Sequence, residues 1–201
     1  MVDGSQTLGG EAIALSRWGA AQVSSERGVF RVDAVAGDMI EVTFDPTSLD
    51  VLLEVGVPTE IHDGDWIGAG RQWLRFDGGG AGRVPRLHVL DVNGDVLMTL
   101  TLRGRSLTLG REAGDIVLPW DERLAELHLQ FVVREGRAFV QNLAGDRSTW
   151  VVLRPGAVVP SGSTLVAGER RVQVRVAAAS DDATACTGPC PHQGASAHAA
   201  A

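Results

Sequence analysis

The sequence predicts an all-β protein made of two tandem β-sandwiches and a C-terminal tail. Three observations support this fold class: an internal repeat of roughly a hundred residues, apolar spacing closer to two than to 3.6, and abundant glycine, 25 of 201 residues. A repeat of that length exceeds the unit of a solenoid. It therefore suits two domains of one kind.

The repeat is an alignment of the chain with itself. In its longest part, glycine at 64 and 70 matches glycine at 162 and 168, and apolar residues face apolar residues. Such a match constrains the architecture more strongly than any short motif. The aligned stretches are 5–12 with 106–113, 36–38 with 144–146, and 61–76 with 159–174.

Short alternating segments bounded by turn residues predict the strands in order. In the first half we expect strands at 20–24, 29–35, 39–44, 66–68 and 73–76. In the second half the turn pair Asn93-Gly94 supplies the positive φ angles of a tight hairpin. There we expect strands at 87–92, 95–102, 106–110, 115–118, 127–134, 137–143, 148–153, 164–167 and 170–176.

The expected domain boundaries follow from composition. The glycine-rich stretch 78–84 is predicted to be a flexible linker between a lobe at 1–77 and a second lobe at 85–177. Residues 178–201 are rich in Ala, Ser and Gly and lack periodicity, so we expect a disordered tail.

Charge and composition bear on the class of partner. Asp and Glu number 25 against 18 basic residues, a net charge of −7, which disfavours a nucleic-acid partner. The N-terminus has no basic, apolar leader and no apolar run approaches a membrane span, so we expect a cytoplasmic protein without membrane contact. Both cysteines fall in the tail, which argues against a disulfide-stapled secreted domain.

The second half resembles a forkhead-associated (FHA) domain over about residues 87–176. The segments LTLGR (107–111), DIVL (115–118) and LAELH (124–128) follow the order of that family's Gly-Arg, Asn-Asp-Ile-x-Leu and Ser-Arg-x-His motifs. Residues 159–168 resemble its closing turn. The first half carries its own fragments, LSR (15–17) and HDGDWIG (62–68). The resemblance implies two tandem FHA-like sandwiches, whose apical loops commonly bind phosphothreonine peptides.

The resemblance also implies a binding edge in the second lobe. Arg111 stands at the phosphate-clamping arginine, and Arg147, Ser148 and Thr149 stand near the family's Asn-Gly-Thr motif. Ala125 and Glu126 replace the Ser-Arg pair, and a carboxylate there repels phosphate if it points inward. We expect His128 to be structural. Trp120 and Trp150 are candidates for an apolar platform at this edge.

The first copy lacks the complementary part of the site. Gly10 occupies the place of Arg111, whereas Ser16 and Arg17 survive. The copy is also about eight residues shorter than the second between 11 and 15. Either Met1 is not the natural start, or this lobe completes its sheet by packing on the second.

The sequence thus predicts a non-enzymatic protein-interaction module without a cofactor, in which phosphothreonine binding is weak or lost. No nucleophile elbow accompanies His128, Asp146 and Ser148. One alternative is phosphothreonine-peptide binding through Arg111 in Ser/Thr kinase signalling of the bacterial type. Another is a zinc-binding regulatory tail built on Cys186, Cys190 and His192.

Overall fold

The predicted all-β class is confirmed. The computed structural model describes residues 11–16, 19–80, 83–91, 93–103 and 106–177, which form strands, turns and loops without a helix. The strands of the first repeat are β1 (Glu11–Leu15), β2 (Ala20–Ser25), β3 (Gly28–Ala34), β4 (Met39–Phe44), β5 (Leu52–Glu54), β6 (Thr59–Ile61), β7 (Trp66–Ala69) and β8 (Gln72–Asp77). The later strands are β9 (Arg86–Leu90), β10 (Val96–Thr101), β11 (Ser106–Gly110), β12 (Ile116–Val117), β13 (Leu129–Arg134), β14 (Arg137–Asn142), β15 (Thr149–Val152), β16 (Ala157–Pro160), β17 (Thr164–Ala167) and β18 (Arg170–Val176).

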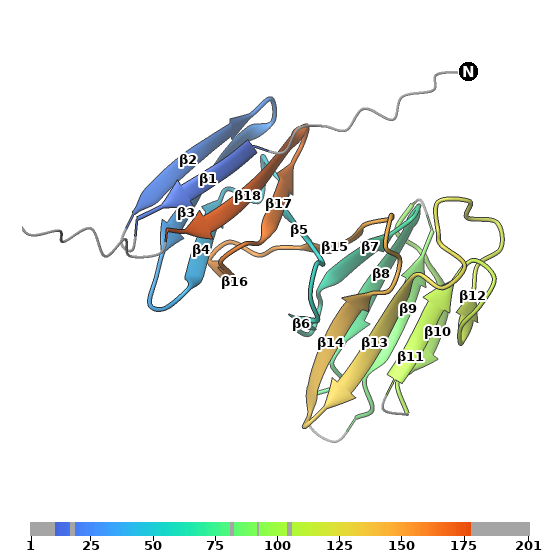
Figure 1. Cartoon of the computed structure of the whole chain (residues 1–201). Helices are drawn as coiled ribbons and strands as arrows, with labels where there is room; N and C mark the ends of the chain where they lie inside the picture. The colour runs from blue at the N-terminus through green and yellow to red at the C-terminus, as the bar shows by residue number, and fades with distance from the viewer. Residues whose placement is uncertain (1–10, 17–18, 81–82, 92, 104–105, 178–201) are drawn as a thin grey trace, which may run out of the picture.

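These strands build two lobes that share one long sheet (Figure 1). The nine-stranded sheet runs β1-β18-β17-β5-β15-β7-β8-β9-β10. A four-stranded sheet, β16-β4-β3-β2, faces one half of it, and a five-stranded sheet, β12-β11-β13-β14-β6, faces the other. Each lobe is therefore a β-sandwich with alternating buried and exposed side chains along its strands.

Two separate hydrophobic cores show which residues belong to which lobe. The core of the terminal lobe takes residues from both ends of the described chain, from Leu15 to Leu53 and from Val159 to Val174. The core of the middle lobe takes residues from Val55 to Val151. The terminal lobe thus contains β1–β5 and β16–β18, and the middle lobe contains β6–β15.

This division differs from the expected boundary at 78–84. Strands β8 and β9, on either side of that stretch, pair directly, with Phe76 opposite Leu87 in the middle-lobe core. The glycine-rich stretch is therefore a connection inside one lobe. Composition marks a turn well, but it does not reveal whether the flanking strands share a core.

The repeat is confirmed for 61–76 and 159–174, whose equivalent positions lie 98 residues apart. The match of 5–12 with 106–113 is not, because Glu11 and Ala12 lie in β1 whereas 112–113 lie in the loop after β11. The hydrogen bond from Gly64 N–H to the Phe76 carbonyl has its counterpart from Gly162 to Val174, both 2.8 Å. Both glycines have positive φ, 81° and 92°, a region that favours glycine. The matched stretches 36–38 and 144–146 are not equivalent, because the first is the β3–β4 turn and the second follows β14.

The two repeats exchange strands reciprocally. Strand β6 of the first repeat pairs with β14 of the second, with Ile61 opposite Ala138. Strand β16 of the second repeat pairs with β4 of the first, with Val159 opposite Ile40. Ile61 and Val159 are equivalent positions, 98 residues apart, and so are Ile40 and Ala138, so the two strand pairs have the same register. The segments that follow, β7–β8 and β17–β18, complete the lobe that the other repeat began; we call 59–77 and 157–176 the exchanged segments.

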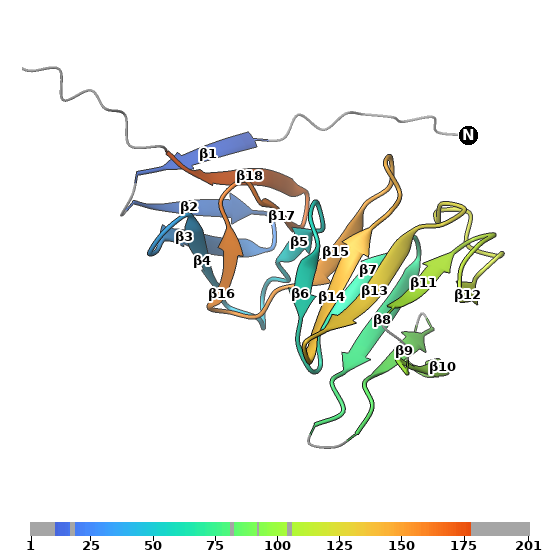
Figure 2. The ribbon, with the colours of Figure 1, turned by 60° about the horizontal axis from the view of Figure 1, so that its bottom comes forward.

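The centre of this exchange is the antiparallel pair β5 and β15. Leu53 lies opposite Val151, its own equivalent in the repeat. Val55 N–H donates to the Thr149 carbonyl at 2.9 Å, and Leu153 N–H donates to the Val51 carbonyl at 2.8 Å, again equivalent bonds. The repeats are thus related by an approximate two-fold axis between β5 and β15, where the chain crosses between lobes (Figure 2).

Each crossing segment contains a proline. Pro58 follows β5, and Pro155 follows β15. The chain bends at Gly56 and Val57 before Pro58, and Pro155 and Gly156 form a turn closed by a bond from Ala157 N–H to the Arg154 carbonyl at 3.0 Å. At both crossings the chain therefore changes direction as it leaves its own repeat. The short first lobe accordingly completes its sheet with strands of the second repeat, the packing alternative raised above, because β18 pairs with β1.

Candidate functional site

The predicted binding edge lies in the middle lobe, where β11 ends. A Cβ on Gly110 would lie 2.1 Å from the Glu126 carbonyl oxygen, so only glycine allows these two loops to meet. The N–H of Arg111 donates to the Ala125 carbonyl at 2.8 Å, and that of Glu112 donates to the Glu126 carbonyl at 3.1 Å. The backbone thus brings Arg111 beside the loop that resembles Ser-Arg-x-His.

Arg111 is half-buried and paired with its neighbour. Its guanidinium donates to the Glu112 carboxylate at 2.6 Å, and 34% of its side chain is exposed. Asp115, the other carboxylate nearby in sequence, instead accepts from Thr108 N–H and Oγ1 at 2.8 and 2.9 Å. These bonds from Thr108 lower the pKa of Asp115. The Arg111–Glu112 pair is exposed, so a stronger anion can compete with it.

Arg147 has a structural role in the edge. One guanidinium nitrogen donates to the carbonyls of Glu122 and Leu124 at 2.6 and 2.7 Å. Its own carbonyl accepts from Asn142 Nδ2 at 2.8 Å. Arg147 therefore holds the loop that carries Ala125 against the loop that follows β14. It lies close to the loop that the Arg111 N–H contacts, and its Nη1 is engaged by these two carbonyls.

Ser148 and Thr149 do not point toward Arg111. The Ser148 hydroxyl donates to the Glu54 carboxylate at 2.6 Å, across the junction of the lobes. The same carboxylate accepts from Arg171 at 2.5 Å. Thr149 is fully buried, and its hydroxyl contacts Asn142 Oδ1 at 3.3 Å. Trp150, which follows, lies in strand β15 opposite Gly68 and Glu54 and not in a loop.

His128 is completely buried beneath this edge. Its Nδ1 accepts from Ala125 N–H at 3.0 Å, so the neutral ring carries its proton on Nε2. Burial lowers the pKa of His128, against an opposing backbone interaction with Ser148. Nε2 is buried without a hydrogen-bond partner among the described residues. The ring braces the 125–128 turn and does not reach solvent.

Asp121 is a buried residue of this edge that sequence reasoning missed. It is 1% exposed, and its carboxylate accepts from Arg71 N–H at 2.7 Å and from Arg123 N–H at 3.0 Å. Arg71 belongs to the β7–β8 turn of the exchanged segment. Asp121 therefore ties the edge to a strand pair from the other repeat. Its position directly after Pro119-Trp120 gave no signal for that contact.

The remaining candidates are not brought to the edge. Ser16 lies in the terminal lobe, where its carbonyl accepts from Gly19 N–H at 2.8 Å, whereas Arg111 lies in the middle lobe. Gly10 and Arg17 lie outside the described residues. So do Cys186, Cys190 and His192 of the predicted zinc alternative.

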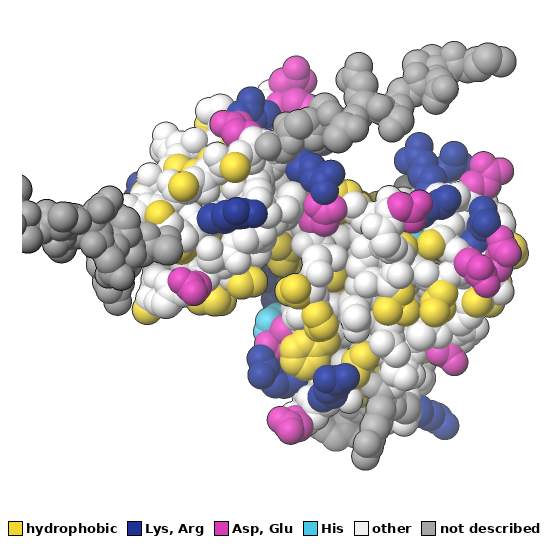
Figure 3. All heavy atoms as spheres, viewed as in Figure 1, with side chains coloured by type: hydrophobic (Ala, Val, Ile, Leu, Met, Phe, Trp, Pro, Cys, Tyr) yellow, Lys and Arg dark blue, Asp and Glu magenta, His cyan; other side chains and the backbone are white. Residues whose placement is uncertain are grey.

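A groove runs between the lobes beside the crossing segments. Its volume is about 1190 Å³, and it is lined by residues that follow β5 and β15. Figure 3 shows the hollow where the lobes meet, with apolar side chains at its rim. The polar residues of its wall include Glu60, His62, Asp65 and Arg154.

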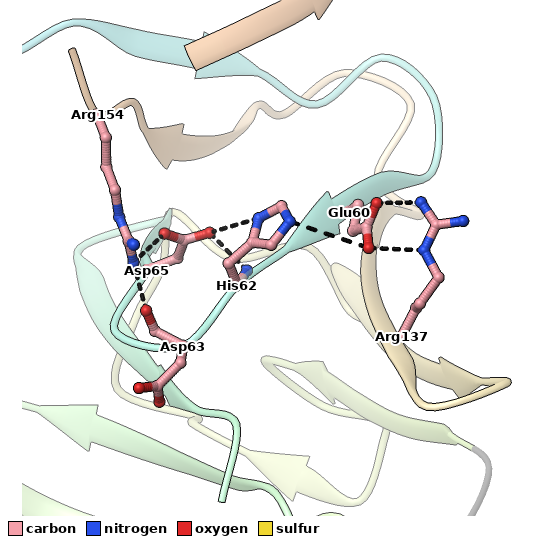
Figure 4. Close-up of polar contacts among 6 residues, drawn as sticks. All are labelled: Glu60, His62, Asp63, Asp65, Arg137 and Arg154. Carbon is pink, nitrogen blue, oxygen red and sulfur yellow. Dashed lines mark hydrogen bonds and ion pairs between the residues drawn. The ribbon is translucent and has the colours of Figure 1, made fainter. Parts of the chain in front are cut away.

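These polar residues tie the exchanged segment in place (Figure 4). Arg154 contacts Asp65 at 2.7 Å and donates to the Asp63 carbonyl, and His62 Nδ1 lies 3.7 Å from Asp65. On β6, the Glu60 carboxylate accepts from Arg137 of β14, which lowers the pKa of Glu60. All of these groups have partners at the junction of the two lobes.

Within the described ranges, His, Cys, Asp and Glu form no group of three or more that could hold a metal ion. No helix among those residues is long and apolar enough to cross a membrane. Comparisons with protein-family models, with curated proteins and with solved structures find no match for the chain.

Proposed function

We propose that this chain is a non-enzymatic protein-interaction module, an FHA-like adaptor whose recognition of phosphothreonine is weak or lost. One observation carries the proposal. Each side chain expected to hold a phosphate already has a partner: Arg111 Nη2 donates to Glu112, Arg147 Nη1 to backbone carbonyls, and Ser148 to Glu54. Thr149 is buried.

The chemistry of phosphate recognition explains why this matters. A dianionic phosphate is held by several charge-assisted hydrogen bonds that converge on one point. Here two of the candidate groups point away from Arg111, and Ala125 offers no hydroxyl. An edge whose candidate groups do not converge on Arg111 retains a surface for proteins but not a phosphate cradle.

A second candidate is phosphothreonine binding through Arg111 alone. The observation that favours it is the exposure of the Arg111–Glu112 pair, whose side chains are 34% and 59% exposed. An exposed pair contributes little, so Arg111 could turn to a phosphopeptide at small cost. Phosphopeptide binding would begin with release of the Arg111 guanidinium from Glu112.

The test is a pull-down with the full chain before and after phosphatase treatment of the partner mixture. The proposal predicts that the captured proteins are the same with and without phosphatase and the same for wild type and Arg111→Ala. Capture that requires phosphate and is lost in Arg111→Ala would support the second candidate instead. Arg134→Ala, on the far end of β13, is a matched control for loss of an exposed arginine.

The zinc alternative rests on the tail and is tested separately. Native mass spectrometry of the full chain with added Zn²⁺ gives the metal stoichiometry directly. A stoichiometric zinc that disappears in Cys186→Ser would establish a metal site in the tail and call for a regulatory role beside the interaction module.

A further inference from the structure

The exchange of strands creates a cavity to which both lobes contribute. On the outer side of the nine-stranded sheet, opposite the two cores, lies a pocket of about 810 Å³. Its floor is an apolar row, because Val152 lies opposite Leu52 and Leu52 lies opposite Val166. Where β15 pairs with β7, Val151 lies opposite Ile67, so the next pair along the strands places Trp66 beside Val152. The floor of the pocket therefore extends from the terminal lobe into the middle lobe.

One wall of this pocket is aromatic. Trp66 and Trp73 line it and remain 38% and 36% exposed. Trp73 is seated over Gly68, its cross-strand partner, because a Cβ at Gly68 would lie 3.1 Å from the indole ring. Two exposed tryptophans at a pocket shaped by a glycine are typical of a recognition surface.

The opposite wall carries negative charge. It is formed by the tips of the β2–β3 and β17–β18 hairpins, which are joined by a bond from Glu26 N–H to the Glu169 carboxylate at 3.0 Å. Glu26, Asp50 and Glu169 supply three carboxylates to the lining, against one guanidinium from Arg27. The pocket is therefore net negative beside an aromatic wall.

We propose that this pocket binds an arginine side chain of a protein partner. An arginine has an apolar stem that suits the apolar floor formed by Val152, Leu52 and Val166. It also has a planar cation that stacks on indole rings. The cation also forms charge-assisted bonds with carboxylates such as Asp50 and Glu169. The inference deepens the proposed interaction function and rests on it, since it names the chemistry of one contact.

The chain's own end segments do not match this chemistry. Residues 1–10 and 178–201 contain neither arginine nor lysine, and the latter segment carries Asp181 and Asp182. Charge complementarity therefore points to a basic side chain supplied by another protein. Phosphate-bearing partners would meet repulsion at the same carboxylates.

The test is calorimetry of the full chain with an acetylated, amidated pentapeptide that has a central arginine between leucines. The comparison peptide carries citrulline, the uncharged isostere, in the same place. We expect the arginine peptide to bind and the citrulline peptide to bind roughly tenfold or more weakly, because it loses the cation–π and ionic contacts. Binding should also weaken as salt is raised.

Variants locate the site. Trp66→Ala and Asp50→Asn should each weaken binding of the arginine peptide about tenfold, and Asp50→Asn keeps the shape of the side chain. Trp120→Ala, 61% exposed in the middle lobe, is the matched control and should bind as wild type. Circular dichroism of each variant checks that the fold is kept.

Three outcomes would overturn the inference: no binding of the arginine peptide at millimolar concentration, equal binding of both peptides, or unchanged binding by Trp66→Ala and Asp50→Asn. These results leave the interaction function standing if the pull-down still captures a partner that Trp66→Ala does not affect. If the pull-down also captures no partner, the proposed function fails with the inference.

Discussion

At the scale of single residues, polar side chains of the middle-lobe edge have structural roles, because they bond to neighbouring parts of the chain. Arg147 and Asp121 each bond to backbone groups of another loop, and His128 accepts from Ala125 N–H in the interior. Buried polar groups need such partners because an unsatisfied one is costly. The same bonds remove these side chains from ligand binding.

His128 predicts how stability depends on pH. Burial lowers its pKa below the ordinary value of 6.5, so the unfolded chain binds a proton that the folded chain does not. Stability contributed by the neutral ring is present above about pH 6.5 and is lost as pH falls below it. The slope from one such group is at most about 1.4 kcal/mol per pH unit.

Urea unfolding of wild type between pH 7.5 and 5 measures this slope. His128→Gln should be less stable at pH 7.5 but should lose less stability on acidification. An identical pH slope in His128→Gln and wild type would contradict the assignment.

At the scale of elements, the short strands decide how the repeats are connected. Strands β6 and β16 are three and four residues long and form the pairs that join the two repeats. Neither they nor β1 and β5 were expected from the sequence. A strand this short has too few alternations to show a period, and its partner lies far along the chain.

The exchange predicts which lobe is weakened by a core substitution. Leu74 is fully buried and lies in the first half of the sequence, but it belongs to the middle-lobe core. Leu74→Ala should cost about 2–5 kcal/mol, as large-to-small core substitutions do. Native-state hydrogen exchange should show the loss of protection in β13 and β14 of the middle lobe.

Leu165→Ala is the matched control. Leu165 is equally buried and lies in the second half of the sequence, but it belongs to the terminal-lobe core. Leu165→Ala should reduce the hydrogen-exchange protection of β3 and β4 instead. If Leu74→Ala loosened β3 and β4 while β13 and β14 stayed protected, the repeats would not be exchanged.

At the scale of the whole molecule, the chain is comparable to a dimer whose subunits exchange segments and have been joined into one polypeptide. The first and last described strands lie in one lobe, since β1 pairs with β18 in parallel. Pairings this distant in sequence close large loops and are expected to form slowly.

The lobe composition predicts which fragments fold. Residues 55–152 contain the whole middle-lobe core and should unfold cooperatively by circular dichroism and thermal melting. Residues 85–177, the expected second domain, lack six core residues of that lobe and should not fold alone; these are Val55, Ile61, Ile67, Ala69, Leu74 and Phe76. A folded 85–177 beside an unfolded 55–152 would contradict the exchange.

The sequence by itself determined the all-β class, most of the longer strands and the existence of the repeat. These depend on local alternation and on residues such as Gly64 and Gly162, whose backbone conformation few other residues adopt. It also identified Arg111 and His128, with Glu112 as one of two carboxylates that could pair with Arg111.

Only the tertiary structure decided how the repeats share their strands, and with that the lobe boundaries and the pocket beside Trp66. The physical reason is that β6 would meet equivalent registers on β4 and on β14, since Ile40 and Ala138 are equivalent positions. Local sequence cannot choose between two such partners. The path of the chain through the crossings at Pro58 and Pro155 and the packing of both cores make that choice.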